Sequence, residues 1–339
     1  MKITVLVPCH NEELTIKKCV SSILKQSRKP DQVIVVNDVS TDNSLKLLKS
    51  FKKKIEVVNT LKSSGNKSHA QEVGLKHVSG DILITTDADT ILHKDFVANI
   101  SAEFNDESVI ASAGYVVSTK QNWLTSCRQI DYLISQEVHK AAQSKINALF
   151  VIPGCAGAYR TKSFKKHISF DHDTLTEDLD FTYKHHQNNL KITFCKKAIV
   201  YTQDPATIDD YVKQLRRWNA GNWQNLLKHY QVMDKPGNAL EMSLIYLEGL
   251  IFPFVLICAF VLNFRIFVMF SITYLAIISA FAFFGAVRDR RWDLLVQIPT
   301  YFFVSFINYA IFIEQFVTEV ILRKKNLAWF QPERRVAAI

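Results

Sequence analysis

Three long apolar runs follow one another in the last third of the chain, and they constrain its fold more than any other feature. Residues 266–287 carry no charged side chain, nor do residues 294–313, while Glu248 and Pro253 interrupt the run 242–264. As a helix, the run 266–287 would extend about 33 Å, which is enough to cross a bilayer. A buried core helix would explain any single run, but three in series predict a membrane region. We place it at 241–322, with segments 242–264, 266–287 and 294–316.

Basic residues do not give these segments a simple orientation. Arg288, Arg290 and Arg291 follow the second run, and positively charged loops favour the cytosolic side of a membrane. Three spans from a cytosolic start would place this loop inside but the basic tail, residues 323–339, outside. Either the charge rule fails here, or one segment is re-entrant or interfacial.

The first 235 residues have the pattern of a soluble domain. The chain enters a strand pattern at Ile3 without a signal peptide, so we expect an integral protein of the plasma membrane with this domain in the cytosol. The six cysteines show no CxxC pairing, and we expect them to be reduced. The net charge of +9 suits phosphates and anionic lipid, and beside the apolar runs we expect no nucleic acid partner.

Residues 3–87 alternate between strand and helix patterns. Short apolar or β-branched runs are separated by amphipathic stretches with helical spacing, and no GxGxxG or Walker loop occurs. This repeated βαβ pattern predicts an α/β fold: a mostly parallel, Rossmann-like sheet with flanking helices. Ligands of such sheets bind at the carboxyl ends of the strands, so polar clusters that follow the strands should share one edge. The clusters are PCHNEE (8–13), NDVSTDNS (37–44) and TDADT (86–90).

Two carboxylates, Asp87 and Asp89, follow the fourth predicted strand. Mg²⁺ and Mn²⁺ prefer oxygen ligands and keep waters and substrate phosphates around them, so the pair predicts a metal site. The alternative is a helix-capping turn with exposed acids. The position on the ligand edge favours the metal, and we expect Thr90 to start the next helix without either carboxylate.

The motif TED places Glu177 and Asp178 directly after Thr176. One of these carboxylates would serve as general base for a hydroxyl nucleophile. The alternative is structural, because Thr176 is a good N-cap and acids in a first turn suit the helix dipole. The same dipole would favour the ionised form of Asp178, which a general base needs.

A basic and aromatic helix is predicted near 209–230, directly before the first apolar run. Gln214, Arg217 and Trp218 fall at i, i+3 and i+4, so they share one helix face. Arginine can bind a diphosphate at two points, and tryptophan offers a flat platform for a sugar ring or a base. An interfacial helix, with Trp at the headgroups and Arg on anionic lipid, is a compatible alternative.

The order of these motifs resembles that of membrane-integrated family 2 glycosyltransferases, which include the cellulose, chitin, hyaluronan and poly-N-acetylglucosamine synthases. PCHNEE, VVNDVSTDNS, GNKSHAQEVGL, DILITTDADT, GAYR, TED and QLRRW occur in this order before the apolar runs, so the resemblance covers about residues 3–320. It implies a GT-A fold for residues 1–235, a UDP-sugar donor and Mg²⁺ or Mn²⁺ as cofactor.

The resemblance also implies a role for each motif residue. Asp178, with Glu177 beside it, would be the catalytic base, while Asp89 would bind the metal and Asp87 would touch the nucleoside side or the metal shell. Gln214, Arg217 and Trp218 would line the diphosphate and the acceptor. The nucleotide-sugar would contact Pro8, His10, Glu12, Asp38, Lys67 and Asp87.

This chain departs from the family pattern at two strand ends. His10 stands where the family usually has Tyr, and Asn37 where it has the first Asp of a pair, although His10 can still stack on a base. The resemblance predicts an inverting synthase that adds a hexose or N-acetylhexosamine to a β-linked polysaccharide. The alternatives are transfer of one sugar to a lipid acceptor and a nucleotide-binding scaffold without activity. The expected partners are a glycan or lipid-linked acceptor, membrane lipids, and an accessory subunit or second copy that completes a channel.

Overall fold

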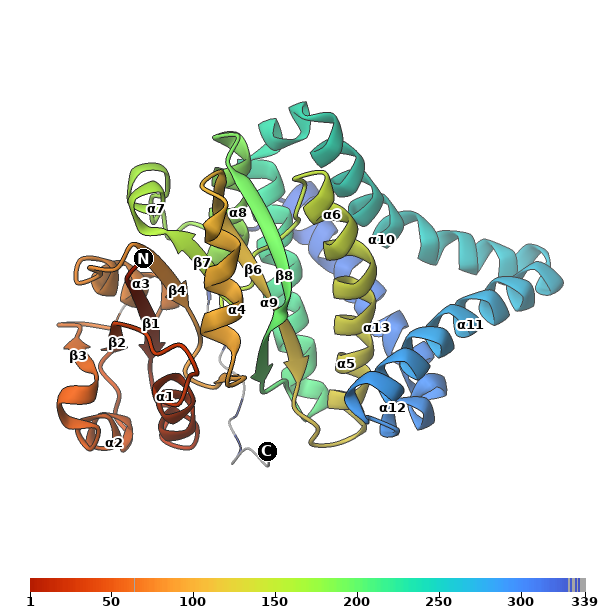
Figure 1. Cartoon of the computed structure of the whole chain (residues 1–339). Helices are drawn as coiled ribbons and strands as arrows, with labels where there is room; N and C mark the ends of the chain where they lie inside the picture. The colour runs from red at the N-terminus through yellow and green to blue at the C-terminus, as the bar shows by residue number, and fades with distance from the viewer. Residues whose placement is uncertain (64, 329, 331–332, 334, 336–339) are drawn as a thin grey trace.

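One mixed sheet forms the centre of the first 235 residues. The computed structural model describes residues 1–63, 65–328, 330, 333 and 335. Within these residues the sheet has the strand order β3-β2-β1-β4-β7-β6-β8-β5 (Figure 1). The strands are β1 Ile3–Cys9, β2 Gln32–Asn37, β3 Glu56–Asn59, β4 Ile82–Thr85, β5 Ile91–Leu92, β6 Val109–Ser118, β7 Gly157–Arg160 and β8 Lys191–Thr202.

The predicted parallel βαβ pattern is confirmed for the first half of the sheet. Strands β3, β2, β1 and β4 run parallel, whereas β7 is antiparallel to both β4 and β6. Parallel strands need crossover segments, and the amphipathic stretches supply them as helices. The helices of this domain are α1 Ile16–Leu24, α2 Ser44–Lys49, α3 Lys67–Leu75, α4 Phe96–Ala102, α5 Trp123–Ile134, α6 Ala141–Lys145, α7 Thr161–His167, α8 Glu177–Gln187 and α9 Ile208–Lys228.

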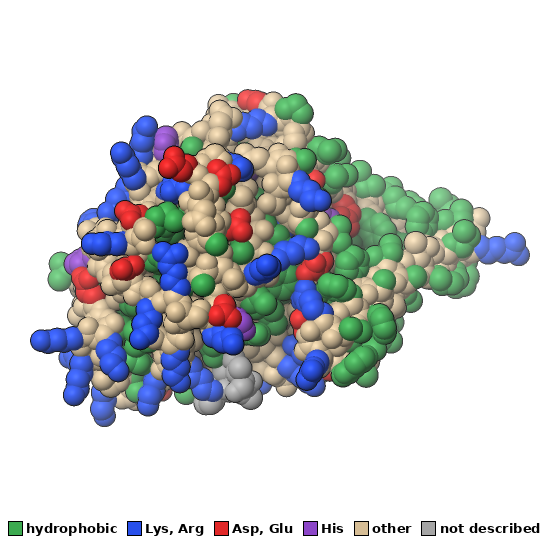
Figure 2. Space-filling view, in the orientation of Figure 1, with side chains coloured by type: hydrophobic (Ala, Val, Ile, Leu, Met, Phe, Trp, Pro, Cys, Tyr) green, Lys and Arg blue, Asp and Glu red, His purple; other side chains and the backbone are tan. Residues whose placement is uncertain are grey.

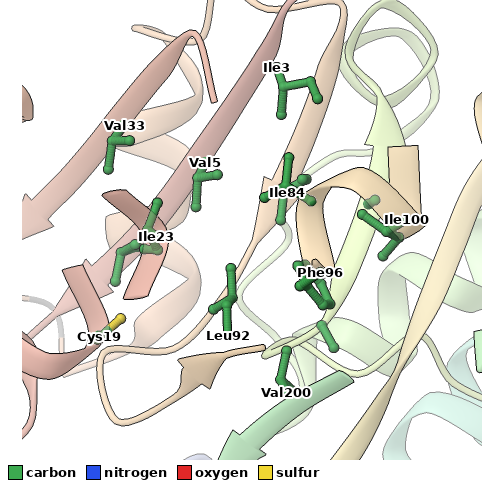
Figure 3. Packing of buried hydrophobic residues seen from close by; sticks show 14 of the residues in the cluster. Ile3, Val5, Cys19, Ile23, Val33, Ile84, Leu92, Phe96, Ile100 and Val200 are labelled. Carbon is green, nitrogen blue, oxygen red and sulfur yellow. The ribbon is translucent and has the colours of Figure 1, made fainter. Parts of the chain in front are cut away.

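The strands bury apolar side chains on both faces, as the sequence pattern requires for a sheet covered by helices on two sides. On one face, Ile3 and Val5 of β1 pack with Ile84 of β4 and Phe96 of α4 (Figure 3). On the other face, Leu6 belongs to a second buried cluster. The two cores fix the sheet, and so they fix the carboxyl ends of β1, β2 and β4 at one edge.

The C-terminal third is helical. It consists of η4 Tyr230–Asp234, α10 Pro236–Leu262, α11 Phe264–Asp289, α12 Asp293–Val296, α13 Ile298–Phe316 and the π-helix η5 Val317–Ile321. Three helices are long and apolar enough to cross a membrane, Pro236–Leu262, Phe264–Asp289 and Ile298–Ile321. Helices α10 and α11 form a hairpin that projects from the domain, and its surface is largely apolar (Figures 1 and 2).

The third predicted segment, 294–316, differs from the other two. It is broken into α12 and α13, because Pro299 lacks an N–H and favours the start of a new helix. Helix α13 lies along α9 and α5: Tyr211 of α9 donates to Asn308 at 2.6 Å, and Tyr301 donates to Asp131 of α5 at 2.6 Å. This helix therefore packs on the N-terminal domain for much of its length.

Both ends of the α12–α13 segment are fixed to the same domain. Ser126 of α5 donates to Asp293 at 2.6 Å, and Gln224 of α9 donates to Glu319 of η5 at 3.0 Å. Arg335 of the basic tail also contacts the domain, through two backbone hydrogen bonds to the side chain of Gln203. Arg334 and residues 336–339 of the predicted tail lie outside the described residues.

Candidate active site

A cavity of about 690 Å³ opens at the predicted edge of the sheet. A cavity of this size suits an organic ligand. The structure brings every residue of the predicted site to its walls. They are Pro8, His10, Glu12, Asp38, Lys67, Asp87, Asp89, Glu177, Asp178, Gln214, Arg217 and Trp218.

Asp38 lies at one end of the cavity and is held by hydroxyl groups. Thr60 donates to one of its carboxylate oxygens at 2.6 Å, and Ser63 donates to the other at 2.9 Å. The ring nitrogen Nδ1 of His10 lies 2.6 Å from the backbone oxygen of Asp38 and donates to it. These contacts fix the imidazole of His10 against the backbone of Asp38, and both residues are among those predicted to contact the nucleotide-sugar.

Lys67 connects the two acidic motifs. Its ammonium lies 2.5 Å from Asp87 and 3.0 Å from Glu177, and these two carboxylates raise the pKa of the lysine despite its burial. Lys67 is the first residue of α3, and Asn66 caps this helix by accepting from the backbone N–H of Ser68. Asp87 is therefore an ion-pair partner in the protein as it stands, whereas Asp89 is not paired with this lysine.

The prediction that Thr90 starts the next helix is wrong. Thr90 is followed by the short strand β5, and α4 begins only at Phe96, after Asp95. The hydroxyl of Thr90 instead donates to the carboxylate of Asp89 at 3.2 Å. Pairing of β5 with β8 overrides the local helix-start signal, and Thr90 supports the carboxylate rather than a helix.

The residues of the strand-end motif fit a divalent cation that shares its coordination with a substrate. Asp87 and Asp89 offer only carboxylate oxygens, and Mg²⁺ or Mn²⁺ would complete its shell with waters and phosphate oxygens. Among the described residues, the one cluster of three acids close enough to surround an ion lies elsewhere: Asp171, Asp173 and Asp180. Lysines neutralise that cluster, because Lys228 pairs with all three acids and Lys184 with two of them.

Asp178 is partly buried in the cavity wall, and its pKa is raised to about 6. Burial is the main cause, and the neighbouring charge of Glu177 adds to it. The backbone N–H groups of Gly154 and Leu179 donate to the carboxylate at 3.2 and 2.9 Å and oppose the rise, as does Lys67. The sequence argument that the helix dipole favours the ionised form is thus outweighed by burial.

Thr176 precedes the two acids but does not cap α8 with its side chain. Its hydroxyl instead accepts a hydrogen bond from Asn225 of α9 at 3.0 Å. Gly221 of α9 lies directly against it: a Cβ built on Gly221 would lie 2.4 Å from the hydroxyl oxygen of Thr176. Helix α9 therefore touches the acidic motif through a position that requires glycine.

The three predicted residues of α9 face the cavity together, as their helical spacing required. Gln214 is buried, and one N–H of Arg217 donates to the backbone oxygen of Phe330 in the tail at 3.0 Å. The ring of Trp218 is covered by the guanidinium of Arg128, which lies 4.4 Å from the ring centroid. The orientation of Trp218 is thus set by a residue of α5.

The sequence argument missed a whole wall of the cavity, formed by α5 and the π-helix η3 Ser135–Lys140. Arg128 of this wall pairs with Asp131 at 3.1 Å and lies 3.7 Å from Asp204. The amphipathic pattern of residues 123–134 marks a helix, but it does not show which polar side chains turn inward. The lining residues that were missed include Arg128, Asp131, Tyr132, Gln136, Lys140, Cys155 and Asp204.

All six cysteines are free in the structure. Cys155 lies in the cavity wall, and burial raises its pKa far above the usual value. A thiol that stays protonated is a poor nucleophile. The chemistry of the cavity therefore rests on its carboxylates and cations.

Comparison with known proteins agrees with this geometry. Residues 4–168 match the family model described as glycosyl transferase family 2. The poly-beta-1,6-N-acetyl-D-glucosamine synthase of Staphylococcus epidermidis is 26% identical over 231 residues, which are 67% of this chain and 56% of the relative. The chain thus matches about half the length of that synthase.

Two other proteins match nearly the whole chain. The probable glycosyltransferase YdaM of Bacillus subtilis is 25% identical over 364 residues, covering 98% of this chain and 87% of the relative. The mannosyltransferase PcManGT from Pyrobaculum calidifontis, solved in complex with GDP-Man and Mn²⁺, has a TM-score of 0.66 at 20% identity and covers 95% of this chain and 88% of that one. This last likeness establishes the fold alone.

Proposed function

The chain carries a glycosyltransferase domain of family 2, and from this premise we propose that it transfers a hexose or N-acetylhexosamine from a UDP-sugar to a growing β-linked polysaccharide. One observation carries the proposal. Asp178, with its raised pKa, lines the same cavity as the strand-end carboxylates Asp87 and Asp89 and the α9 residues Arg217 and Trp218. Family 2 relatives include synthases of such a polymer.

Asp89 and Asp87 would hold Mg²⁺ or Mn²⁺ on the donor diphosphate. The bound ion would offset the negative charge that develops on the leaving nucleoside diphosphate. Arg217 donates to the same diphosphate, and Trp218, held flat by Arg128, supports a sugar ring of the acceptor.

Asp178 would act as the general base. A hydroxyl is a weak nucleophile at neutral pH, and a carboxylate with a pKa near 6 accepts its proton more readily than an ordinary aspartate does. One displacement from the face opposite the leaving group inverts the anomeric carbon, so an α-linked donor gives a β-linked product. The backbone N–H groups of Gly154 and Leu179 hold the carboxylate in place for this step.

We also propose how the protein sits in the membrane. Helices α10 and α11 cross the bilayer as a hairpin, and α13 lies along the membrane surface. The polar residues of α9, including Arg216 and Lys213, support this arrangement, because α13 packs along α9 and could cross the bilayer only by taking these charges with it. The basic loop that contains Arg288, Arg290 and Arg291 and the basic tail 323–339 then lie on the cytosolic side with the catalytic domain. This arrangement satisfies the rule that positively charged segments favour the cytosol, which three spans would violate.

The test uses membranes that contain the protein, labelled UDP-sugars and Mn²⁺ or Mg²⁺. We expect turnover of at least one UDP-sugar, its loss on chelation of the metal, and a loss of about 10³-fold or more in Asp178→Asn with UDP affinity retained. Asp173→Asn, an acid outside the cavity, is the matched control. Absence of turnover with every UDP-sugar would refute the proposal, and unchanged turnover in Asp178→Asn would refute the role of this base.

A second acceptor class is favoured by one observation. Lys140 lies buried in the cavity wall near Asp178, and a cation at that place suits an anionic acceptor such as a polyprenyl phosphate. Labelled product that extracts into organic solvent would identify the lipid acceptor. Product that remains in the aqueous phase and grows in length would identify the polysaccharide.

A further inference from the structure

Lys140 is a buried cation of the cavity that no motif predicts. It ends the π-helix η3, it is only 6% exposed, and it lines the cavity. Lysine is almost never buried to this degree unless it is paired. π-Helical turns are rare and often occur at functional sites.

The ammonium of Lys140 has no ion-pair partner among the residues that the structure describes. Two comparable lysines of the domain do: the half-buried Lys67 pairs with two acids of the cavity, and the buried Lys184 pairs with Asp171 and Asp180. Burial lowers the pKa of Lys140 to about 8, while Asp178 and Cys155 oppose the decrease without reversing it. A charge that is removed from water and left without a partner is what a site for an anionic group requires.

The backbone that carries Lys140 is rigid. Four residues earlier, Gln136 donates to the backbone oxygens of Val116 and Tyr132 at 2.8 and 3.1 Å and accepts from the backbone N–H of Val116 at 2.7 Å. These bonds fix η3 on strand β6. Lys140 therefore belongs to a wall that does not carry the predicted diphosphate-binding residues, which follow β4 (Asp87 and Asp89) or lie on α9 (Arg217).

We propose that Lys140 forms a subsite that binds a phosphate or carboxylate group on the acceptor side of the catalytic cavity. The inference rests on the proposed function in one respect, namely that Asp178 marks the place of the acceptor hydroxyl. In the proposed function, Arg217 and a metal ion held by Asp87 and Asp89 would bind the donor diphosphate, and these three residues lie outside α5 and η3. A negative group that reaches Lys140 is thus a second one, carried by the acceptor or by the far side of the transferred sugar.

The first experiment measures anion binding without any turnover. The full-length protein in detergent is saturated with UDP and Mn²⁺, and inorganic phosphate is titrated while the melting temperature is recorded. Wild type should be stabilised by phosphate, Lys140→Met should bind it at least about 10-fold more weakly, and Lys140→Arg should recover part of the affinity. Lys145→Met, an exposed lysine on the adjacent helix α6, is the matched control and should behave as wild type.

The second experiment identifies the source of the anion. Turnover is measured with a polyprenyl phosphate against a neutral oligosaccharide as acceptor, and with UDP-glucuronate against UDP-glucose as donor. The KM of Lys140→Met should rise about 10-fold or more only for the partner that carries the recognised group, with kcat little changed.

Two results would overturn the proposal: equal phosphate affinity in wild type and Lys140→Met, or an equal rise in KM for charged and neutral partners. The second result would show that Lys140 only supports the fold. Failure of the proposed function gives a different result from failure of the Lys140 subsite. If only the proposed function fails, wild type turns over no UDP-sugar, but phosphate still binds wild type more tightly than Lys140→Met.

Discussion

Substitution of Gly221 by alanine is expected to inactivate the enzyme without unfolding it. The new Cβ would lie 2.4 Å from the hydroxyl oxygen of Thr176, where ordinary contact begins at 3.4 Å. The difference, 3.4 − 2.4 = 1.0 Å, is the distance that α9 and the TED motif must move apart. Thr176 directly precedes Glu177 and Asp178, so this movement displaces the proposed base. A displacement of about 1 Å at a reacting group costs about 100-fold in rate.

The stability of this variant should change little. Overpacking costs about 1–3 kcal/mol, while alanine is favoured over glycine inside a helix by about 1 kcal/mol. The net loss is then about 0–2 kcal/mol. We expect kcat to fall about 100-fold in the radiolabelled UDP-sugar assay.

Gly237→Ala is the matched control for this prediction. It lies in the neighbouring helix α10, and the nearest atom to its added Cβ is the backbone oxygen of Ile146 at 3.7 Å, which is an ordinary contact. Its activity should equal that of wild type. If Gly221→Ala also retained full kcat, the argument that α9 positions the base through Thr176 would be refuted.

Three further predictions concern pH, aromatic stacking and topology. Because the pKa of Asp178 is raised to about 6 and a general base must be ionised, kcat/KM should fall tenfold per pH unit below about 6, and a profile flat down to pH 5 would contradict this. Arg128→Lys keeps the charge but loses the planar stack on Trp218, so the acceptor KM should rise about 5- to 30-fold with kcat within about twofold, as steady-state kinetics would show. In sealed vesicles, a membrane-impermeant maleimide should label Lys324→Cys from the side of the catalytic domain. It should label Arg265→Cys, which is near the turn between α10 and α11, from the opposite side. Labelling of both variants from one side would exclude a hairpin that crosses the bilayer.

The edge that carries the site could be predicted because it follows from strand direction alone. Asp38 follows β2 and Asp87 follows β4, and both strands run parallel to β1, so their polar ends had to meet. Helical spacing was sufficient in the same way for Gln214, Arg217 and Trp218. Where a periodic backbone fixes the direction of a side chain, the sequence pattern is enough to place it.

Other features depend on packing between segments that are distant in the chain. The burial of Lys140 and the stacking of Arg128 on Trp218 arise only when α5 and η3 close the cavity, and a helical pattern does not show which polar residues turn inward. The raised pKa of Asp178 has the same origin, since local sequence supplied only the helix dipole. Thr90 and Thr176 both have a propensity to start a helix. Thr90 instead precedes strand β5, which pairs with β8, and the hydroxyl of Thr176 accepts a hydrogen bond from Asn225 of α9.

Hydropathy alone does not fix how the third apolar segment lies relative to the membrane. Its composition is that of a candidate membrane span, although its helix has a mean hydropathy of 1.3 against 2.4 and 2.3 for the two helices before it. The difference lies in polar side chains of other segments, such as Tyr211 and Asp131, that hold α13 along the domain. In the proposed arrangement, these polar partners from distant parts of the sequence keep α13 on the membrane surface.

In the proposed arrangement, helix α9 lies between α13 on the membrane surface and the cavity that Gln214 and Arg217 line. A change in the depth of α13 would then reach Gln214 and Arg217 through the packing of α13 on α9, and would reach the acidic motif through the contact of Gly221 with Thr176. The physical properties of the bilayer would then affect the turnover rate of the enzyme. Acyl chain length and lateral pressure should set its turnover in reconstituted vesicles, where thicker or thinner bilayers move α13 relative to a fixed sheet.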